Sequence, residues 1–193
     1  NMKIVELIID ERDSESGIDA VSVVESPAIE ENFIALAEQK IELKEIDAEK
    51  RILMGAALIP NKKIYRVNEK TKEEFEIFFS EQTVRQAMEL FFKKGNQSKA
   101  TQEHAKSIDG MTVVESWLIE DKVHDKSVKY GFSLPKGTWM ISMKVDNDQV
   151  WNDVKEGKVK GFSIEGFFAD KLEMSMEQKE KIEIIEQLKS LLK

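Results

Sequence analysis

Short segments rich in β-branched and aromatic residues recur along most of this 193-residue chain. Such runs are typical of strands when turn residues such as Gly, Pro, Asn and Asp bound them. This recurrence constrains the fold more than any other feature of the sequence, and it predicts a mainly β domain. The expected strands are residues 2–11, 18–24, 40–46, 51–59, 63–67, 74–79, 112–120, 138–145 and 159–168.

Helical patterns are fewer. Ser80 is a suitable N-cap for a helix over residues 81–94, which Gly95 would end. A second helix is expected over residues 147–156, and a third, amphipathic helix over residues 175–193. We therefore divide the chain into a domain at 1–169, a linker at 170–174 and a C-terminal helix. The pattern leaves open whether that helix docks on another protein, forms a dimer or packs on its own domain.

Composition excludes several classes of function. The chain has no cysteine, so disulfides, thiol nucleophiles and thiolate metal sites are excluded. Its net charge of −8 is unfavourable for binding nucleic acid. No apolar run approaches the roughly 20 residues of a membrane span, so we expect a soluble, cytoplasmic protein without a membrane partner. The acidic run 146–148 lacks the glycine and distal glutamate of a calcium loop, and no metal or other cofactor is expected.

Only two histidines could act as a general base. His124 lies in a polar stretch, 120–126, where a solvated loop histidine is the simplest interpretation. His104 follows the helix stop at Gly95 and precedes the next strand. By itself such a histidine is also more often structural than catalytic. Its importance depends on a nucleophile that it could serve.

Ser163 is the candidate nucleophile. It lies in a segment of strand-forming residues that also holds Gly161 and Gly166. Glycine weakens a strand, so its presence needs a cause such as the close approach of a substrate or of another backbone. Two interpretations stay open at this point: a catalytic serine with nearby amides as oxyanion donors, or a bulged strand in which the serine is merely small. Histidine could activate such a serine, and composition cannot select the carboxylate that would orient it.

Several strings resemble the XkdF-like serine proteases of phage and prophage head modules. They are residues 55–66, 100–104, 110–117, 135–139 and 161–168, within a resemblance that spans about 51–169. That family is similar to the prohead proteases and the herpesvirus assemblins. The resemblance implies a closed β-barrel with flanking helices. Because the segment that resembles the last strand of that barrel lies at 17–28, we expect a circular permutation.

The resemblance also implies site residues. A histidine followed in the chain by a serine matches His104 and Ser163. Assemblins use a second histidine after the serine, and this chain has none there. Other prohead proteases use an acidic residue, for which the permuted barrel implies Asp19. Glu165, on the same strand face as Ser163, is the alternative.

The implied activity is serine endopeptidase chemistry during assembly of the phage head. The expected substrates are the scaffold and major capsid proteins, and the enzyme itself, inside proheads in the host cytoplasm. Self-association is expected, in a form that the sequence leaves open. Two alternatives remain: a catalytically inactive head scaffold or adaptor on the same fold, and an esterase or amidase that acts on small substrates.

Overall fold

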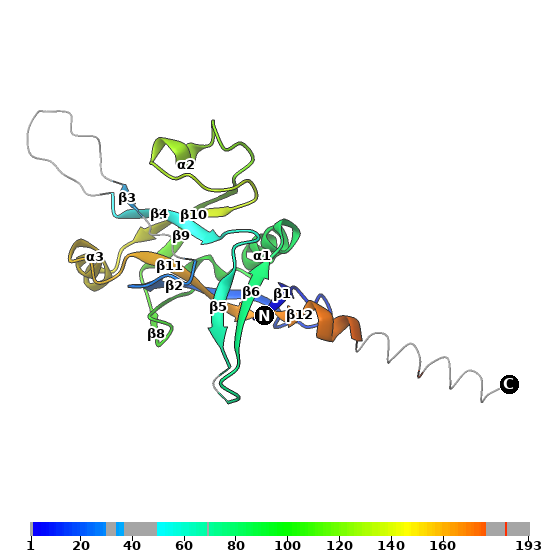
Figure 1. Ribbon diagram of the computed structural model, residues 1–193. Helices are drawn as coiled ribbons and strands as arrows, with labels where there is room; N and C mark the ends of the chain where they lie inside the picture. The colour runs from blue at the N-terminus through cyan, green and yellow to red at the C-terminus, as the bar shows by residue number, and fades with distance from the viewer. Residues whose placement is uncertain (1, 30–33, 37–49, 69, 177–183, 185–193) are drawn as a thin grey trace, which may run out of the picture.

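A computed structural model describes residues 2–29, 34–36, 50–68, 70–176 and 184. The protein is mainly β, as the sequence predicts (Figure 1). The strands are β1 (Lys3–Ile8), β2 (Gly17–Val24), β3 (Ile34–Leu36), β4 (Ile52–Leu58), β5 (Ile64–Val67), β6 (Glu74–Phe79), β7 (Ala100–Gln102), β8 (Lys106–Ile108), β9 (Met111–Leu118), β10 (Trp139–Val145), β11 (Gly161–Phe167) and β12 (Ala169–Asp170). The labelled helices are α1 (Glu81–Lys93), α2 (Lys126–Lys129) and α3 (Asp148–Lys155), and a 3₁₀ turn lies at Asn96–Ser98.

The described strands form three sheets of four strands each. Their orders are β12-β1-β6-β5, β3-β4-β10-β9 and β11-β2-β7-β8. In the third sheet β11 runs antiparallel to β2, and β2 runs parallel to β7. The strand that carries Ser163 is therefore a direct neighbour of a strand from the N-terminal part of the chain, and β7 leads on to His104.

The expected closed barrel is wrong. Strands β11 and β4 approach each other, but no ladder of hydrogen bonds joins the sheets to which they belong. Instead, the chain changes sheets: β12, directly after β11, pairs with β1 rather than extending the sheet of β2. Because side-chain packing replaces strand pairing at this junction, the described part of the chain forms three open sheets.

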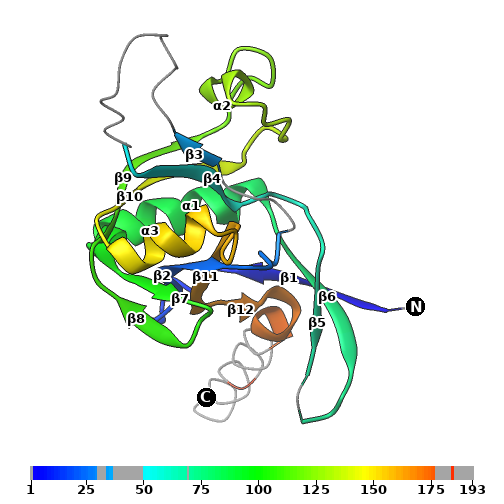
Figure 2. The same cartoon turned by 90° about the vertical axis from the view of Figure 1, so that its left-hand side faces the viewer.

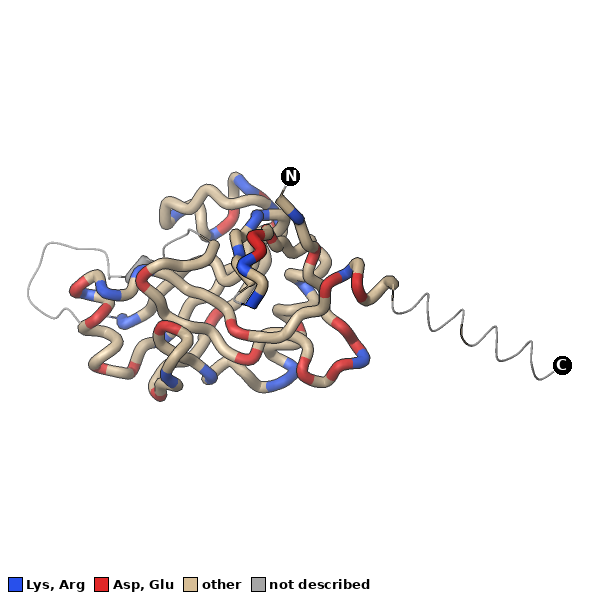
Figure 3. Tube along the Cα trace, turned by 60° about the horizontal axis from the view of Figure 1, so that its bottom comes forward, with Lys and Arg blue, Asp and Glu red and all other residues tan. Residues whose placement is uncertain are grey.

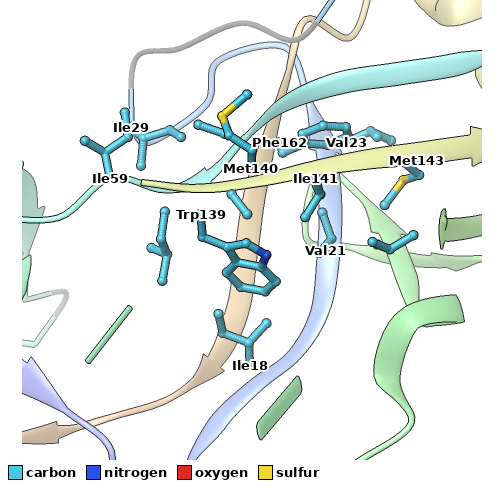
Figure 4. Close-up of a cluster of buried hydrophobic side chains, with 14 of the residues drawn as sticks. Ile18, Val21, Val23, Ile29, Ile59, Trp139, Met140, Ile141, Met143 and Phe162 are labelled. Atoms are coloured by element: carbon cyan, nitrogen blue, oxygen red, sulfur yellow. The ribbon is translucent and has the colours of Figure 1, made fainter. Parts of the chain in front are cut away.

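One continuous hydrophobic core lies between the sheets. Trp139 and Ile141 of β10 face Ile18, Val21 and the other apolar residues of β2 (Figure 4). Phe162 of β11 joins the same cluster and is fully buried. Because Phe162 points into this core, the alternating residues of β11 on either side of it face the opposite way. The core thereby fixes the direction of the Ser163 side chain.

Two of the expected helices flank the sheets (Figure 2). Helix α1 begins at the predicted N-cap: Ser80 Oγ accepts a hydrogen bond from Thr83 N, and the buried face of the helix contacts β2, β6 and β10. Helix α3 is capped by Asn147 and buries Val150 and Trp151. The amphipathic patterns thus predicted both helices within a residue or two.

The C-terminal part of the chain was divided from sequence into a linker and a helix. Residues 169–170 form β12, and residues 171–176 are helical. The rest of the expected terminal helix, apart from Ile184, lies outside the described residues, as does the expected strand at 40–46. The division into domains stays a prediction.

Charged residues of both signs are interspersed over the described trace (Figure 3). Several form ion pairs between neighbouring strands or turns, such as Lys63 with Glu76 at 3.0 Å and Lys171 with Glu6 at 2.8 Å. In the described part of the chain, no helix is long and apolar enough to cross a membrane.

Candidate active site

Ser163 lies in the middle of β11, directly opposite Ser22 of β2. It is 9% exposed, and Ser22 is fully buried. Opposed residues of an antiparallel pair point to the same face and have Cβ atoms about 4.5–5.5 Å apart. Glu165 lies two residues further along β11 and therefore on that same face. The face of this sheet turned away from the core thus carries two hydroxyls and a carboxylate.

His104 occupies the tight turn between β7 and β8. The two residues at the centre of the turn have left-handed backbone angles, with φ of 50° at Glu103 and 55° at His104. Ala105 N closes the turn by donating to Gln102 O at 3.1 Å. Left-handed angles are costly for residues other than glycine and persist only where the surroundings enforce them.

Two side-chain hydrogen bonds anchor this turn to β2 and to the residue that follows it. His104 N donates to Ser22 Oγ at 3.1 Å, and Glu25 N donates to Glu103 Oε1 at 2.6 Å. Ser22 Oγ in turn donates to Thr101 O at 3.3 Å. The residue opposite the candidate nucleophile therefore holds the backbone of the candidate base.

The His104 imidazole is paired with Glu165. Nδ1 lies 2.9 Å from Glu165 Oε1, and the two side chains are 43% and 29% exposed. Thr101 Oγ1 donates to the same carboxylate oxygen. A carboxylate on Nδ1 fixes the tautomer that leaves Nε2 as the acceptor, which is the arrangement a serine nucleophile requires. Glu165, the alternative third residue in the sequence analysis, is thus in contact with His104.

The Ser163 hydroxyl makes no hydrogen bond to His104 or to any other described residue in this structure. The two residues are nevertheless neighbours, because Ser22 faces Ser163 across the strands and binds His104 N. Catalytic hydrogen bonds are often long in enzymes without substrate and shorten when substrate binds.

Asp19 lies elsewhere on β2. It is the extra residue where the register shifts, since Ile18 faces Gly166 and Ala20 faces Glu165. It is half-buried, and no described residue forms a side-chain hydrogen bond or ion pair with its carboxylate. The structure does not bring Asp19 into contact with His104 or Ser163, and its assignment as the third residue stays a prediction.

The imidazole of His124 is hydrogen-bonded to a residue nearby in the sequence, Asp121. Its Nδ1 lies 2.7 Å from Asp121 Oδ2, and its side chain is 81% exposed. The hydrogen bond from His124, with those from backbone amides, lowers the pKa of the Asp121 carboxyl to about 2. This matches the solvated loop histidine expected from sequence.

The structure explains why glycine occupies position 166. A Cβ atom at this position would lie 2.0 Å from Gly17 O, inside the backbone of β2 at the register shift. The close approach of another backbone, one of the two causes considered for the glycines around Ser163, is therefore present at Gly166. It does not exclude a catalytic role for Ser163, because Gly166 lies three residues beyond it.

A pocket of about 180 Å³ opens beside Ser163. Ile164, Leu58 and Phe79 are among its mainly apolar walls. A larger pocket, of about 410 Å³, lies between residues 9–14 and α1, and neither Ser163 nor His104 lines it. Among the described residues no group of three or more His, Asp or Glu side chains could hold a metal ion.

The left-handed backbone of the turn predicts different stabilities for two variants that both lack the imidazole. Both His104→Gly and His104→Ala remove the imidazole, but only glycine accepts a φ of 55° without strain. We expect His104→Gly to be more stable than His104→Ala by about 1 kcal/mol, measured by urea unfolding. Ala105→Gly, in the same turn but without a positive φ, is the control and should destabilise. Equal stability of the two His104 variants would contradict this backbone geometry.

Asp153 of α3 binds Gln102, the last residue of β7 before the turn. Its carboxylate accepts from Gln102 Nε2 at 2.9 Å and from Gln149 Nε2 at 3.0 Å, and the residue is buried. The hydrogen bond from Gln102, then that from Gln149 and the charge of Lys158, lower the pKa of the Asp153 carboxyl, against an opposing effect of burial.

A pH dependence follows from Asp153. A carboxyl whose pKa is lower in the folded state stabilises the fold above its unfolded pKa of about 3.9, and this contribution is lost as the pH falls through the folded pKa. We expect Asp153→Asn to be less stable than the wild type at pH 7 by about 1–3 kcal/mol. The difference should shrink below pH 4 in urea unfolding curves. A difference that is constant from pH 7 to pH 3 would contradict the role of the ionised carboxylate.

Taken together, Ser163 and Glu165 lie on one face of a sheet in a mainly β protein, and His104 contacts Glu165 from a neighbouring turn. A serine, a histidine and a carboxylate are the residue types that a serine hydrolase uses. Residues 38–173 match the family described as "Putative phage serine protease XkdF". The match covers more than half of the chain, so the chain belongs to this family, and the resemblance recognised from its sequence is confirmed. No curated protein and no solved structure matches significantly.

Proposed function

We propose that this protein is a serine endopeptidase in which Ser163 is the nucleophile, His104 the general base and Glu165 the residue that orients His104. The observation that carries the proposal is the contact of His104 Nδ1 with Glu165, two residues from Ser163 on the same strand face. Membership of a family described as phage serine proteases supports it independently.

The chemistry would be acyl transfer. Nε2 of His104 takes the proton of Ser163 Oγ as this oxygen bonds to the substrate carbonyl carbon. The tetrahedral intermediate then breaks the C–N bond, and the imidazolium gives its proton to the leaving amine. Water, deprotonated by the same imidazole, releases the acyl group. Backbone amides of β11 between Ser163 and Gly166 would stabilise the oxyanion.

The proposed biological role is maturation of the phage head. The substrates would be segments of the scaffold and major capsid proteins, cleaved inside proheads in the host cytoplasm. The family assignment to phage proteases supports this role. To test it, the protein is incubated with the scaffold and capsid proteins of its own phage, and the new termini are identified by mass spectrometry. Intact substrates after prolonged incubation under assembly conditions would overturn the proposal in favour of a non-catalytic head protein.

The small pocket favours a peptidase over an esterase or amidase that acts on small substrates. Pockets that enclose whole ligands of drug size usually measure about 300–1,000 Å³. The pocket beside Ser163 measures about 180 Å³, which suits one side chain of a longer substrate. The rest of such a substrate would lie outside the pocket.

The third catalytic residue can be assigned by a matched pair of variants. Glu165→Gln keeps the shape of the side chain but removes the charge that stabilises the imidazolium, and we expect a loss of turnover of about 10²–10⁴. Asp19→Asn, made on the neighbouring strand, should leave turnover within a few-fold of the wild type. Initial cleavage rates of one fluorogenic peptide measure both. A large loss in Asp19→Asn with an active Glu165→Gln would reverse the assignment.

A further inference from the structure

The pocket beside Ser163 lies between β11 and the sheet of β1, β6 and β5. Its walls are aliphatic or aromatic except for Ser163, Gly166 and Arg66, and the full set is Leu7, Ala28, Ile29, Ala57, Leu58, Ile64, Arg66, Ile77, Phe79, Ser163, Ile164, Gly166 and Phe168. A substrate residue whose side chain binds in this pocket would need an apolar segment to contact these walls. The lining contains one charged side chain, which is a cation.

That cation is Arg66. It alternates along β5 with Ile64, whose buried side chain also lines the pocket, so both point to the same face. Desolvation lowers the pKa of the Arg66 guanidinium, although the residue as a whole is exposed. Arg66 donates a hydrogen bond to the carbonyl oxygen of Tyr65 at 2.9 Å, and no carboxylate of a described residue pairs with it. Such a guanidinium, still charged and partly removed from water, is suited to bind a carboxylate.

Strand β11 lies at the edge of its sheet, and β4 approaches it without pairing. Among the described strands β11 pairs with β2, and no ladder forms on its other side. An extended peptide can add to such an edge as a further strand, with main-chain hydrogen bonds for affinity and pockets for alternate side chains. A peptide placed there would pass Ser163 and present side chains towards the pocket.

We propose that this pocket is the primary specificity pocket of the enzyme and that it selects glutamate at the residue whose carbonyl is attacked. The two methylene groups of the side chain contact the apolar walls, and Arg66 binds the carboxylate. This inference rests on the proposed function, since it requires attack by Ser163. It goes beyond that function by naming the substrate class: extended peptides cleaved after an acidic residue.

The test uses three aminoalkyl phosphonate diphenyl esters, which differ only in carrying a glutamate, glutamine or leucine side chain. Rates of covalent labelling are measured by intact-protein mass spectrometry, and the labelled residue is mapped by peptide digestion. We expect the glutamate probe to label the wild-type protein about 10- to 100-fold faster than the glutamine probe. In Arg66→Met this ratio should fall to about 1, while the glutamine and leucine probes keep their rates within a few-fold.

Lys63→Met is the matched control. Lys63 lies just before β5 and pairs with Glu76 instead of lining the pocket, so its loss should leave the glutamate preference unchanged. If Ser163 is labelled but glutamate is not preferred, or Arg66→Met keeps the preference, the inference fails and the proposed function stands. If no probe labels Ser163, the proposed function fails, and the inference fails with it.

Discussion

Replacing Ser163 by alanine is expected to lower the rate of peptide cleavage by on the order of 10⁶, to the background of the assay. The hydroxyl is the group to which the acyl group is transferred, and the nearby hydroxyl of Thr101 already donates to Glu165. Ser22 lies opposite, but its Oγ already accepts from His104 N and donates to Thr101 O. The measurement is the rate of product formation from the identified substrate at saturating concentration.

The fold should survive this substitution. Ser163 Oγ makes no hydrogen bond to a described residue, so alanine leaves no protein donor or acceptor without its partner. Urea unfolding of Ser163→Ala is therefore expected to match the wild type within about 1 kcal/mol. Cleavage at the wild-type rate by a folded Ser163→Ala would show that another residue is the nucleophile.

Replacing Gly166 by alanine is expected to be the most destabilising single methyl addition in the site. The new Cβ would lie 2.0 Å from Gly17 O and 2.8 Å from Ile18 Cα, both of which are backbone atoms of β2. Backbone cannot move aside as a flexible side chain can, so β11 and β2 must separate where Glu165 is positioned. We expect a loss of at least about 4 kcal/mol in the free energy of unfolding, or failure to accumulate as folded protein.

Gly157→Ala provides the comparison. Gly157 has a φ of 70°, and nothing lies within 4 Å of the Cβ position, so only the left-handed backbone opposes alanine. That cost is about 1–2 kcal/mol. Comparable stability of Gly166→Ala and Gly157→Ala would contradict the register shift between β11 and β2.

The sequence predicted the longer elements because their patterns were strong. Alternation and β-branched residues identified β2, β4, β10 and β11, and an N-cap with an amphipathic face identified α1. It missed β7 and β8, which have three residues each and are joined by Glu103 and His104 in left-handed conformations. Turns of this kind favour Gly, Asn and Asp, so a Glu-His pair gives no signal of a hairpin.

The pairing of His104 with Glu165 could be predicted only as an alternative. Two-residue periodicity placed Glu165 on the face of Ser163, but the position of His104 depends on the parallel pairing of β2 with β7 and on Ser22. Neither is local in sequence. The closed barrel was predicted wrongly from resemblance, because the approach of β11 to β4 is made by packing rather than by hydrogen bonds, which no pattern in either strand reveals.

The measurement that tests the central claim most directly is the site of reaction with a fluorophosphonate probe. The folded protein is treated with the probe and digested, and the modified residue is identified by tandem mass spectrometry, beside His104→Ala and a denatured sample. We predict stoichiometric modification of Ser163 in the folded wild type and a rate at least 100-fold lower in the other two samples. Modification elsewhere, or equal reaction at Ser163 with and without the imidazole, would contradict the account.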